Sequence, residues 1–150
     1  MSACPGRILL AEDDRHDQEL ILRALKEHRI DNEVVVVDDG AKALDYLHRR
    51  GEYASVPPGN PALVLLDIKM PKVDGLEVLR EVRATEELRM LPVVMLTSSR
   101  EHQDINESYT RGTSAYVVKP VDYTDFVSAI GKIGAFWGLL NEPPPGTVVR

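Results

Sequence analysis

Short apolar segments alternate along the chain with segments whose apolar residues recur at helical spacing. Five of the short segments are apolar at nearly every position, which is typical of strands buried on both faces of a sheet. Strands that alternate with helices in this way favour a parallel sheet covered by helices. We therefore expect a doubly wound α/β fold with strands at residues 7–12, 33–38, 62–67, 92–97 and 114–119.

Segments of helical period lie between these strands. Helices are expected near residues 20–28, 41–50, 76–85 and 101–109. A last helix is expected after Asp122, which together with Asp125 resembles a capping box. Residues 51–61 hold Gly or Pro at five of eleven positions and predict a long surface loop.

Length and composition indicate one soluble domain. The chain has 150 residues, of which 43% are hydrophobic, enough for an ordinary core. Three consecutive prolines cannot continue a helix, so we expect a domain at 7–140 between an N-terminal extension at 1–6 and a tail at 141–150. No apolar run approaches a membrane span, and the first seven residues lack an apolar signal core, so a cytoplasmic location is expected.

Charge and cysteine content narrow the possible partners. A net charge of -6 disfavours binding to DNA and to other polyanions, because such binding depends on clustered Lys and Arg. The single cysteine, Cys4, cannot form an internal disulfide or a Cys-based metal site. We expect neither DNA nor a membrane as a partner.

Polar side chains stand where the predicted strands end. In doubly wound sheets ligands bind at the carboxyl ends of the strands, beside the point where the strand order reverses. The residues expected at that edge are Glu12, Asp13, Asp67, Thr97, Ser98 and Lys119, the last of them followed by Pro120. Carboxylates crowded together repel one another unless protons or a cation neutralise them, and oxygen ligands favour Mg²⁺, with Mn²⁺ as a possible substitute.

Other ligands of such folds are excluded by motif. A flavodoxin would need an uncharged phosphate-binding loop after the first strand, where this chain has the sequence EDDRHD. Neither G-x-G-x-x-G after the first strand nor G-x-x-x-x-G-K-[ST] is present. Asp14, within the acidic run, is expected to cap the first helix and is not assigned to the site.

These residues together resemble the receiver domain of two-component response regulators, of the kind found in chemotaxis regulators. The resemblance rests on Glu12-Asp13, on Asp67 with the sequence MPKVDG, on Thr97-Ser98 and on Tyr116-x-x-Lys119-Pro120, and it covers residues 7 to about 138. It implies a flavodoxin-like sheet with strand order 2-1-3-4-5. It also implies a signalling protein that is not an enzyme but assists its own phosphorylation and dephosphorylation.

The resemblance implies a role for each acidic residue. Asp67 would accept a phosphoryl group from a histidine kinase as an acyl phosphate. Mg²⁺ would be bound by Asp13, Asp67 and the backbone carbonyl of Lys69, and Glu12 would act through the water shell of the metal. Lys69 stands where many relatives carry Asn, beside the path of the hydrolytic water, so it is expected to affect the lifetime of the phosphate.

The remaining positions would bind or report the phosphoryl group. Thr97 and Lys119 would hold its oxygens, Ser98 would lie beside it, and the position of the Tyr116 side chain would report the state of the domain. The bond between Lys119 and Pro120 would be cis.

Two other function classes remain open. A Mg²⁺-dependent phosphohydrolase of the haloacid-dehalogenase type is disfavoured, because it would need a second aspartate where this chain has Lys69. A degenerate scaffold receiver is disfavoured because Asp13, Asp67, Thr97 and Lys119 are all present.

A finer resemblance concerns the segment DYLHRRGEYASVPPGNPALVLLDIKMPKVDG and the later FWGLL. Both are similar to stand-alone receivers paired with phytochrome-type histidine kinases. This implies a red-light sensor kinase as phosphodonor, and a receiver for another kinase or relay is the alternative.

The end of the last helix predicts an interaction surface. An apolar stripe at helical spacing, beside glycines at 131, 134 and 138, is formed by Phe126, Ile130, Ile133, Trp137 and Leu140. A glycine costs about 1 kcal/mol of helix propensity, so close packing is expected beside them. We expect a homodimer held partly by this end of the chain, through the four apolar residues Phe136, Trp137, Leu139 and Leu140.

Overall fold

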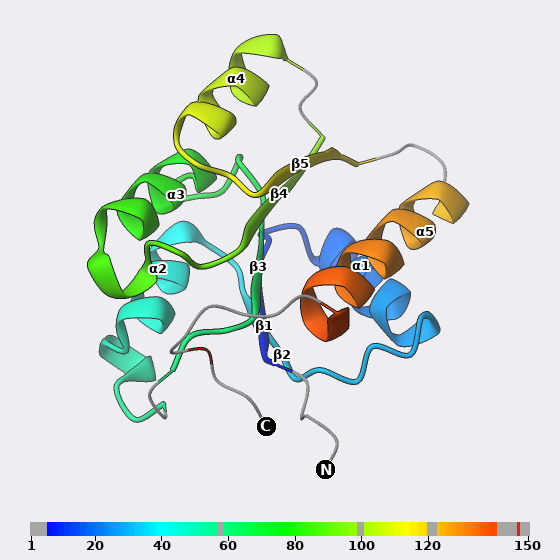
Figure 1. Ribbon diagram of the computed structural model, residues 1–150, viewed down its shortest axis with the longest axis horizontal. Helices are drawn as coiled ribbons and strands as arrows, with labels where there is room; N and C mark the ends of the chain where they lie inside the picture. The colour runs from blue at the N-terminus through cyan, green and yellow to red at the C-terminus, as the bar shows by residue number, and fades with distance from the viewer. Residues whose placement is uncertain (1–5, 57–58, 99–100, 120–122, 141–146, 148–150) are drawn as a thin grey trace.

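A five-stranded parallel sheet forms the centre of the protein (Figure 1). The computed structural model describes residues 6–56, 59–98, 101–119, 123–140 and 147, without the side chains of 123 and 138–140. The strands are β1 (Ile8–Ala11), β2 (Val34–Val37), β3 (Leu63–Leu66), β4 (Val93–Thr97) and β5 (Ala115–Val118). Their order is β2-β1-β3-β4-β5, which confirms the predicted fold class and strand order.

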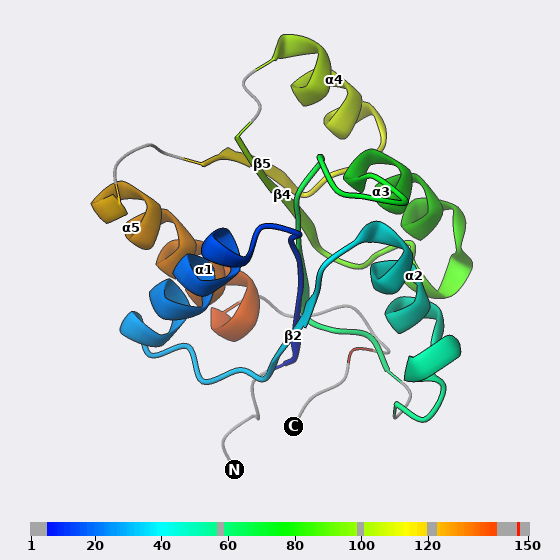
Figure 2. The same cartoon turned by 180° about the vertical axis from the view of Figure 1, so that it is seen from behind.

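Helices cover both faces of the sheet. They are α1 (Arg15–Glu27), α2 (Gly40–His48), α3 (Gly75–Ala84), α4 (His102–Thr110) and α5 (Tyr123–Ile133). Figures 1 and 2 show α1 and α5 side by side on one face, and α2, α3 and α4 on the other. Single 3-10 turns, η1 (Gly51–Tyr53) and η2 (Glu86–Leu88), interrupt the loops after α2 and α3. No helix in the described part of the chain is long and apolar enough to cross a membrane.

The uninterrupted apolar runs are explained by burial on both faces. Leu9 and Ala11 of β1 belong to the apolar cluster beneath α2 and α3. Ile8 and Leu10 belong to the separate cluster beneath α1 and α5. Because successive side chains of a strand point to opposite faces, an apolar strand with a helix layer on each side has no polar position in its sequence.

Aspartates begin three of the helices. Asp14 accepts a hydrogen bond from the backbone N–H of Asp17 at 2.9 Å, and this confirms its predicted role as the N-cap of α1. Asp39 caps α2 and Asp74 caps α3 in the same way, with distances of 2.7 and 2.9 Å. The side-chain oxygen satisfies one of the backbone N–H groups that the first turn of a helix leaves without a partner. These caps fix where each helix starts after its strand.

The chain beyond α5 differs from the single helix that we expected. Gly134–Leu140 forms a π-helical segment, η3, which alters the spacing of the predicted stripe. Phe126, Ile130 and Ile133 are buried in the core, whereas Trp137 is half-buried against it and Phe136 is 48% exposed. The two rings make an edge-to-face contact with centroids 4.8 Å apart.

Two of the glycines at this end are explained by the packing of α1 on α5. A Cβ added at Gly131 would overlap the imidazole of His28. One added at Gly134 would lie 2.7 Å from Leu25 Cδ2 and 3.2 Å from Ile30 Cγ1. All three neighbours lie in α1 or just after it, so the close approach predicted from these glycines occurs within the domain.

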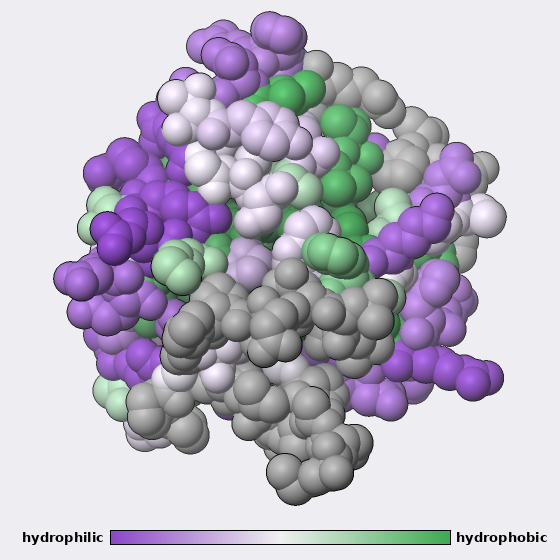
Figure 3. All heavy atoms as spheres, in the orientation of Figure 1, coloured by the Kyte–Doolittle hydropathy of each residue, from purple (hydrophilic) through white to green (hydrophobic). Residues whose placement is uncertain are grey.

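Apolar and charged residues are segregated on the face seen in Figure 3. Apolar side chains gather over β5, between α4 and α5, whereas charged residues dominate over α2 and α3. β5 is an edge strand whose four residues are all half-buried. Exposed apolar surface beside a sheet edge is typical of a site where another chain binds.

Candidate functional site

Asp67 directly follows the central strand β3 and is only 8% exposed. Its backbone N–H donates to the carbonyl of Ala11 at 3.1 Å, which continues the β1–β3 ladder. The turn after it closes with a 2.8 Å hydrogen bond from the N–H of Gly75 to the carbonyl of Ile68. A Cβ at position 75 would overlap the carbonyl oxygen of Asp67, so only glycine lets α3 start this close to the aspartate.

Asp67 and two further carboxylates, from the ends of β1 and β3, lie close together. Ligand oxygens of Glu12, Asp13 and Asp67 all lie within 4.8 Å of one another. No other group of three potential metal-binding side chains occurs in the described ranges. Three oxygen ligands of negative charge fit a hard divalent cation such as Mg²⁺ or Mn²⁺. The side chain of Lys69 is exposed. The group of Lys69 that is expected to bind the metal is its backbone carbonyl, and this role stays a prediction.

Lys119 reaches into this cluster from the end of β5. Its Nζ donates to Glu12 Oε1 at 2.6 Å and to Asp67 Oδ2 at 3.1 Å. It also donates to Asp17 Oδ2 at 2.8 Å, and its side chain is 11% exposed. The backbone N–H of Lys119 donates to the carbonyl of Thr97 at 2.8 Å, so the β4–β5 ladder sets the position from which the side chain extends.

The charges of the cluster shift two pKa values. Burial raises the pKa of Glu12 to about 7, and the charge of Asp67 adds to this, whereas the hydrogen bond from Lys119 opposes it. Burial pushes the pKa of Lys119 down, but its hydrogen bonds to Asp17 and Glu12 and the charge of Asp67 outweigh burial, so the pKa is raised. Lys119 is therefore a permanent cation, and the raised pKa of Glu12 lets this carboxyl take up a proton near neutral pH.

Thr97 and Ser98 complete this edge of the sheet from β4. Thr97 is fully buried at the last position of the strand, and Ser98 after it is exposed. Tyr116 pairs with Met95 in the β4–β5 ladder and packs against the cluster beneath α2 and α3. Pro120 lies outside the described residues, so the predicted cis bond stays a prediction.

Asp17 is the residue that the sequence did not suggest. It lies in the first turn of α1, three residues after the Asp14 cap, and is brought to Lys119 by a contact between residues 102 positions apart. Its local signal is only a fourth acid in the sequence EDDRHD, which does not distinguish it from a solvated helix start.

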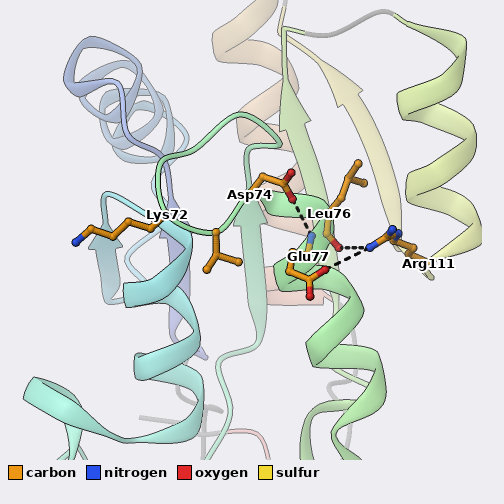
Figure 4. A pocket seen from close by; sticks show the side chains of 6 residues that line it. Lys72, Asp74, Leu76, Glu77 and Arg111 are labelled. Carbon is orange, nitrogen blue, oxygen red and sulfur yellow. Dashed lines mark hydrogen bonds and ion pairs between the residues drawn. The ribbon is translucent and has the colours of Figure 1, made fainter.

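A separate cavity of about 340 Å³ lies between the start of α3 and the end of α4, and is lined by Lys72, Val73, Asp74, Leu76, Glu77 and Arg111 (Figure 4). It contains none of the predicted site residues. The guanidinium of Arg111 donates to the carbonyl of Leu76 at 3.3 Å and lies 3.8 Å from Glu77 Oε2. These contacts tie α4 to α3 and balance the charges of the cavity.

The family is decided by comparison with known proteins. The family model of the response regulator receiver domain matches residues 8–131. The chain belongs to this family. Response regulator Rcp1 of Synechocystis is 38% identical over 133 residues, which are 89% of each chain. The Mn²⁺-bound structure of Rcp1 has a TM-score of 0.86 at 36% identity, over 93% of this chain and 99% of that one.

Two further solved structures are response regulators of phytochromes. The bacteriophytochrome response regulator RtBRR is 57% identical, with a TM-score of 0.76 over 95% of this chain and 86% of that one. The phosphorylated cyanobacterial phytochrome response regulator RcpA is 37% identical, with a TM-score of 0.86 over 93% of this chain and 98% of that one. The receiver fold and the acidic cluster therefore occur here in a chain similar to several phytochrome response regulators.

Proposed function

We propose that this receiver accepts a phosphoryl group on Asp67 from a histidine kinase and signals as a single-domain response regulator. The observation that carries the proposal is the position of Asp67, buried at the end of β3 within the acidic cluster and 3.1 Å from the ammonium of Lys119. A carboxylate placed between a cation site and a fixed ammonium is suited to receive an anionic group.

In the proposed reaction, an oxygen of ionised Asp67 attacks the phosphorus of a phosphohistidine. The new P–O bond forms as the P–N bond breaks, and the imidazole leaves with the electron pair of that bond. A divalent cation held by Asp13 and Asp67, by the carbonyl of Lys69, and by Glu12 through water would cancel charge between the two anions.

The chain's own polar residues would orient and retain the phosphoryl group. Lys119 is held in place by the β4–β5 ladder and is permanently charged, so it can donate to a phosphoryl oxygen. Thr97 has its hydroxyl-bearing side chain at the same edge, and Ser98 is the exposed residue next to it. Lys69, exposed two residues after Asp67, would affect access of the hydrolytic water.

The signal would leave through the apolar surface beside β5. Tyr116 on this strand is half-buried and packs against the apolar cluster beneath α2 and α3, so a change in its side-chain position would alter the strand that a partner contacts. The fold supports this route because β5 is an edge strand whose apolar side chains are only half-buried and can contact a partner.

A phytochrome-type kinase is the proposed phosphodonor. The proposal is supported by similarity to Rcp1, RtBRR and RcpA, two of which are named as phytochrome response regulators. It predicts that a phytochrome histidine kinase phosphorylates the protein many times faster than an unrelated kinase does at equal concentration. Equal rates from both kinases would favour the alternative of a receiver for another relay.

The protein is also proposed to form a homodimer through the end of α5 and η3. Phe136 is 48% exposed, and Leu139 and Leu140 continue the same apolar segment. Trp137 is half-buried against its own core, so it contributes less free surface than its sequence suggests. Sedimentation of the wild type, of Phe136→Ala and of a truncation after Gly134 tests this. A wild type that stays monomeric at tens of micromolar in both phosphorylation states refutes the dimer.

One assay separates the proposed function from its alternatives. The protein is incubated with acetyl phosphate and Mg²⁺, and the covalent product and the released phosphate are measured. A phosphorylation switch gives a stoichiometric adduct that is stable in acid and labile in base. A phosphohydrolase would instead turn over many equivalents of donor, and a degenerate scaffold would give no adduct.

A further inference from the structure

The ammonium of Lys119 has no donor left for a phosphoryl group. A lysine ammonium carries three hydrogens and no acceptor. All three are engaged, with Glu12 at 2.6 Å, Asp17 at 2.8 Å and Asp67 at 3.1 Å. Any phosphoryl oxygen that bonds to Lys119 must therefore displace one of these carboxylates.

The three carboxylates differ in how readily they can be displaced. The side chain of Glu12 is 2% exposed and that of Asp67 is 10% exposed, whereas that of Asp17 is 28% exposed. A carboxylate that loses its partner must be rehydrated, and this costs least where water already reaches it. Asp67 would also carry the phosphoryl group itself. Asp17 is thus the acceptor that a phosphoryl oxygen displaces most readily from Lys119.

Asp17 is held at Lys119 by the first turn of α1. Its backbone N–H is bonded to the capping side chain of Asp14, which anchors the turn. The backbone of the next residue, Gln18, donates to the carbonyl of Asp14 at 2.9 Å, and the Gln18 side chain donates to the carbonyl of Glu12. The helix start is therefore tied to the end of β1, and the Asp17 carboxylate cannot drift away without a change of rotamer.

We propose that Asp17 is a positioning residue that competes with the phosphoryl group for Lys119. This inference rests on the proposed function of Asp67 as phosphoacceptor. The bond between Asp17 and Lys119 stabilises the unphosphorylated state and is lost when the phosphoryl group binds. Asp17 thereby lowers the affinity of the site for the phosphoryl group and sets how far the phosphorylation equilibrium lies toward the active state.

The test uses beryllofluoride, which binds a carboxylate as a phosphoryl analogue, in the presence of saturating Mg²⁺. Its affinity is measured by calorimetry for the wild type, Asp17→Asn and Asp17→Glu. Loss of a competing charged hydrogen bond predicts roughly tenfold tighter binding by Asp17→Asn. Asp17→Glu keeps a charged carboxylate acceptor and is expected to bind with an affinity close to that of the wild type. Unchanged affinity in Asp17→Asn overturns the inference, provided that its thermal unfolding matches the wild type.

Two controls separate competition for Lys119 from a general effect of charge. Glu19→Gln removes an acid from the same helix whose side chain is 64% exposed and 3.9 Å from Arg15, so it should leave the affinity unchanged. In a Lys119→Gln background, Asp17→Asn should have no effect, because the contested donor is absent. An equal gain from Glu19→Gln, or a gain that persists without Lys119, overturns the inference in favour of long-range repulsion.

The same titration distinguishes this inference from the proposed function. Asp67→Asn should abolish beryllofluoride binding. If the wild type fails to bind, or Asp67→Asn binds equally well, the proposed function and the inference both fail. If Asp67→Asn loses binding while Asp17→Asn equals the wild type, only the role of Asp17 is wrong.

Discussion

Replacing Lys119 by methionine should reveal how strongly one ammonium holds the metal-free site together. The substitution keeps the length of the side chain and removes its charge. Glu12, Asp67 and Asp17 then face one another without the cation that bonds to each of them at 2.6, 3.1 and 2.8 Å. Removing one partner of a buried ion pair costs about 3–5 kcal/mol of stability, and Lys119, with an 11% exposed side chain, falls in that class.

The loss should depend on pH and on metal in a defined direction. Burial and the Asp67 charge already raise the pKa of Glu12 to about 7, and loss of Lys119 raises it further. A folded-state pKa above the unfolded value means that the folded protein gains stability as the pH falls through that range. The deficit of Lys119→Met should thus be largest near pH 8 and smaller near pH 6. Added Mg²⁺ should reduce it, because the metal supplies the missing positive charge.

Urea denaturation of the two proteins at both pH values, with and without Mg²⁺, measures these differences. Lys42→Met is the matched control, since its ion pair with Asp38 at 3.0 Å is solvent-exposed and should contribute little. A deficit below about 1 kcal/mol at pH 8 without metal would refute the reasoning, because it would fall below the range expected for a buried pair. A deficit that is independent of pH would show that Glu12 does not take up the compensating proton.

Three further predictions concern the metal and the turn after Asp67. Asp13→Ala should raise the Mg²⁺ concentration needed for phosphorylation by at least about tenfold, since it removes an anionic ligand, and an unchanged requirement would mark Asp13 as a turn residue. Gly75→Ala should destabilise the fold by about 1–3 kcal/mol and slow phosphorylation, because its Cβ displaces the Asp67 carbonyl; wild-type stability in thermal unfolding would contradict this. The affinity for Mg²⁺, measured by calorimetry, should increase from pH 6 to pH 8 as Glu12, with its pKa of about 7, loses its proton, whereas a flat profile would exclude that residue from metal binding.

The sequence predicted the architecture because the central strands lie between two helix layers. Leu63–Leu66 is buried at every position, and such a run admits few alternatives to a central parallel strand. The caps at Asp14 and Asp74 depend on local sequence alone, because a capping aspartate accepts a hydrogen bond from a backbone N–H only three residues away. Ligands of doubly wound sheets bind at the carboxyl ends of the strands, and this alone predicted that Glu12 and Asp67 lie close together.

Other features depend on contacts that no local pattern encodes. The hydrogen bond between Asp17 and Lys119 joins residues 102 positions apart, and the sequence around either residue does not predict it. Gly131 and Gly134 suggested close packing, but only the structure identifies His28 and Leu25 as the groups that need the space. The change from α-helix to π-helix at Gly134 likewise has no signal in the spacing of the apolar residues.

The central claim is that Asp67 is the phosphoacceptor, and mapping the phosphorylated residue tests it most directly. Wild type and Asp67→Asn are treated with acetyl phosphate and Mg²⁺, trapped by borohydride reduction of the acyl phosphate, and sequenced by mass spectrometry. We expect one modified residue, Asp67, in the wild type, and no adduct in a folded Asp67→Asn variant. A modification at Asp13 or elsewhere in the wild type, or an adduct that persists in Asp67→Asn, would contradict it.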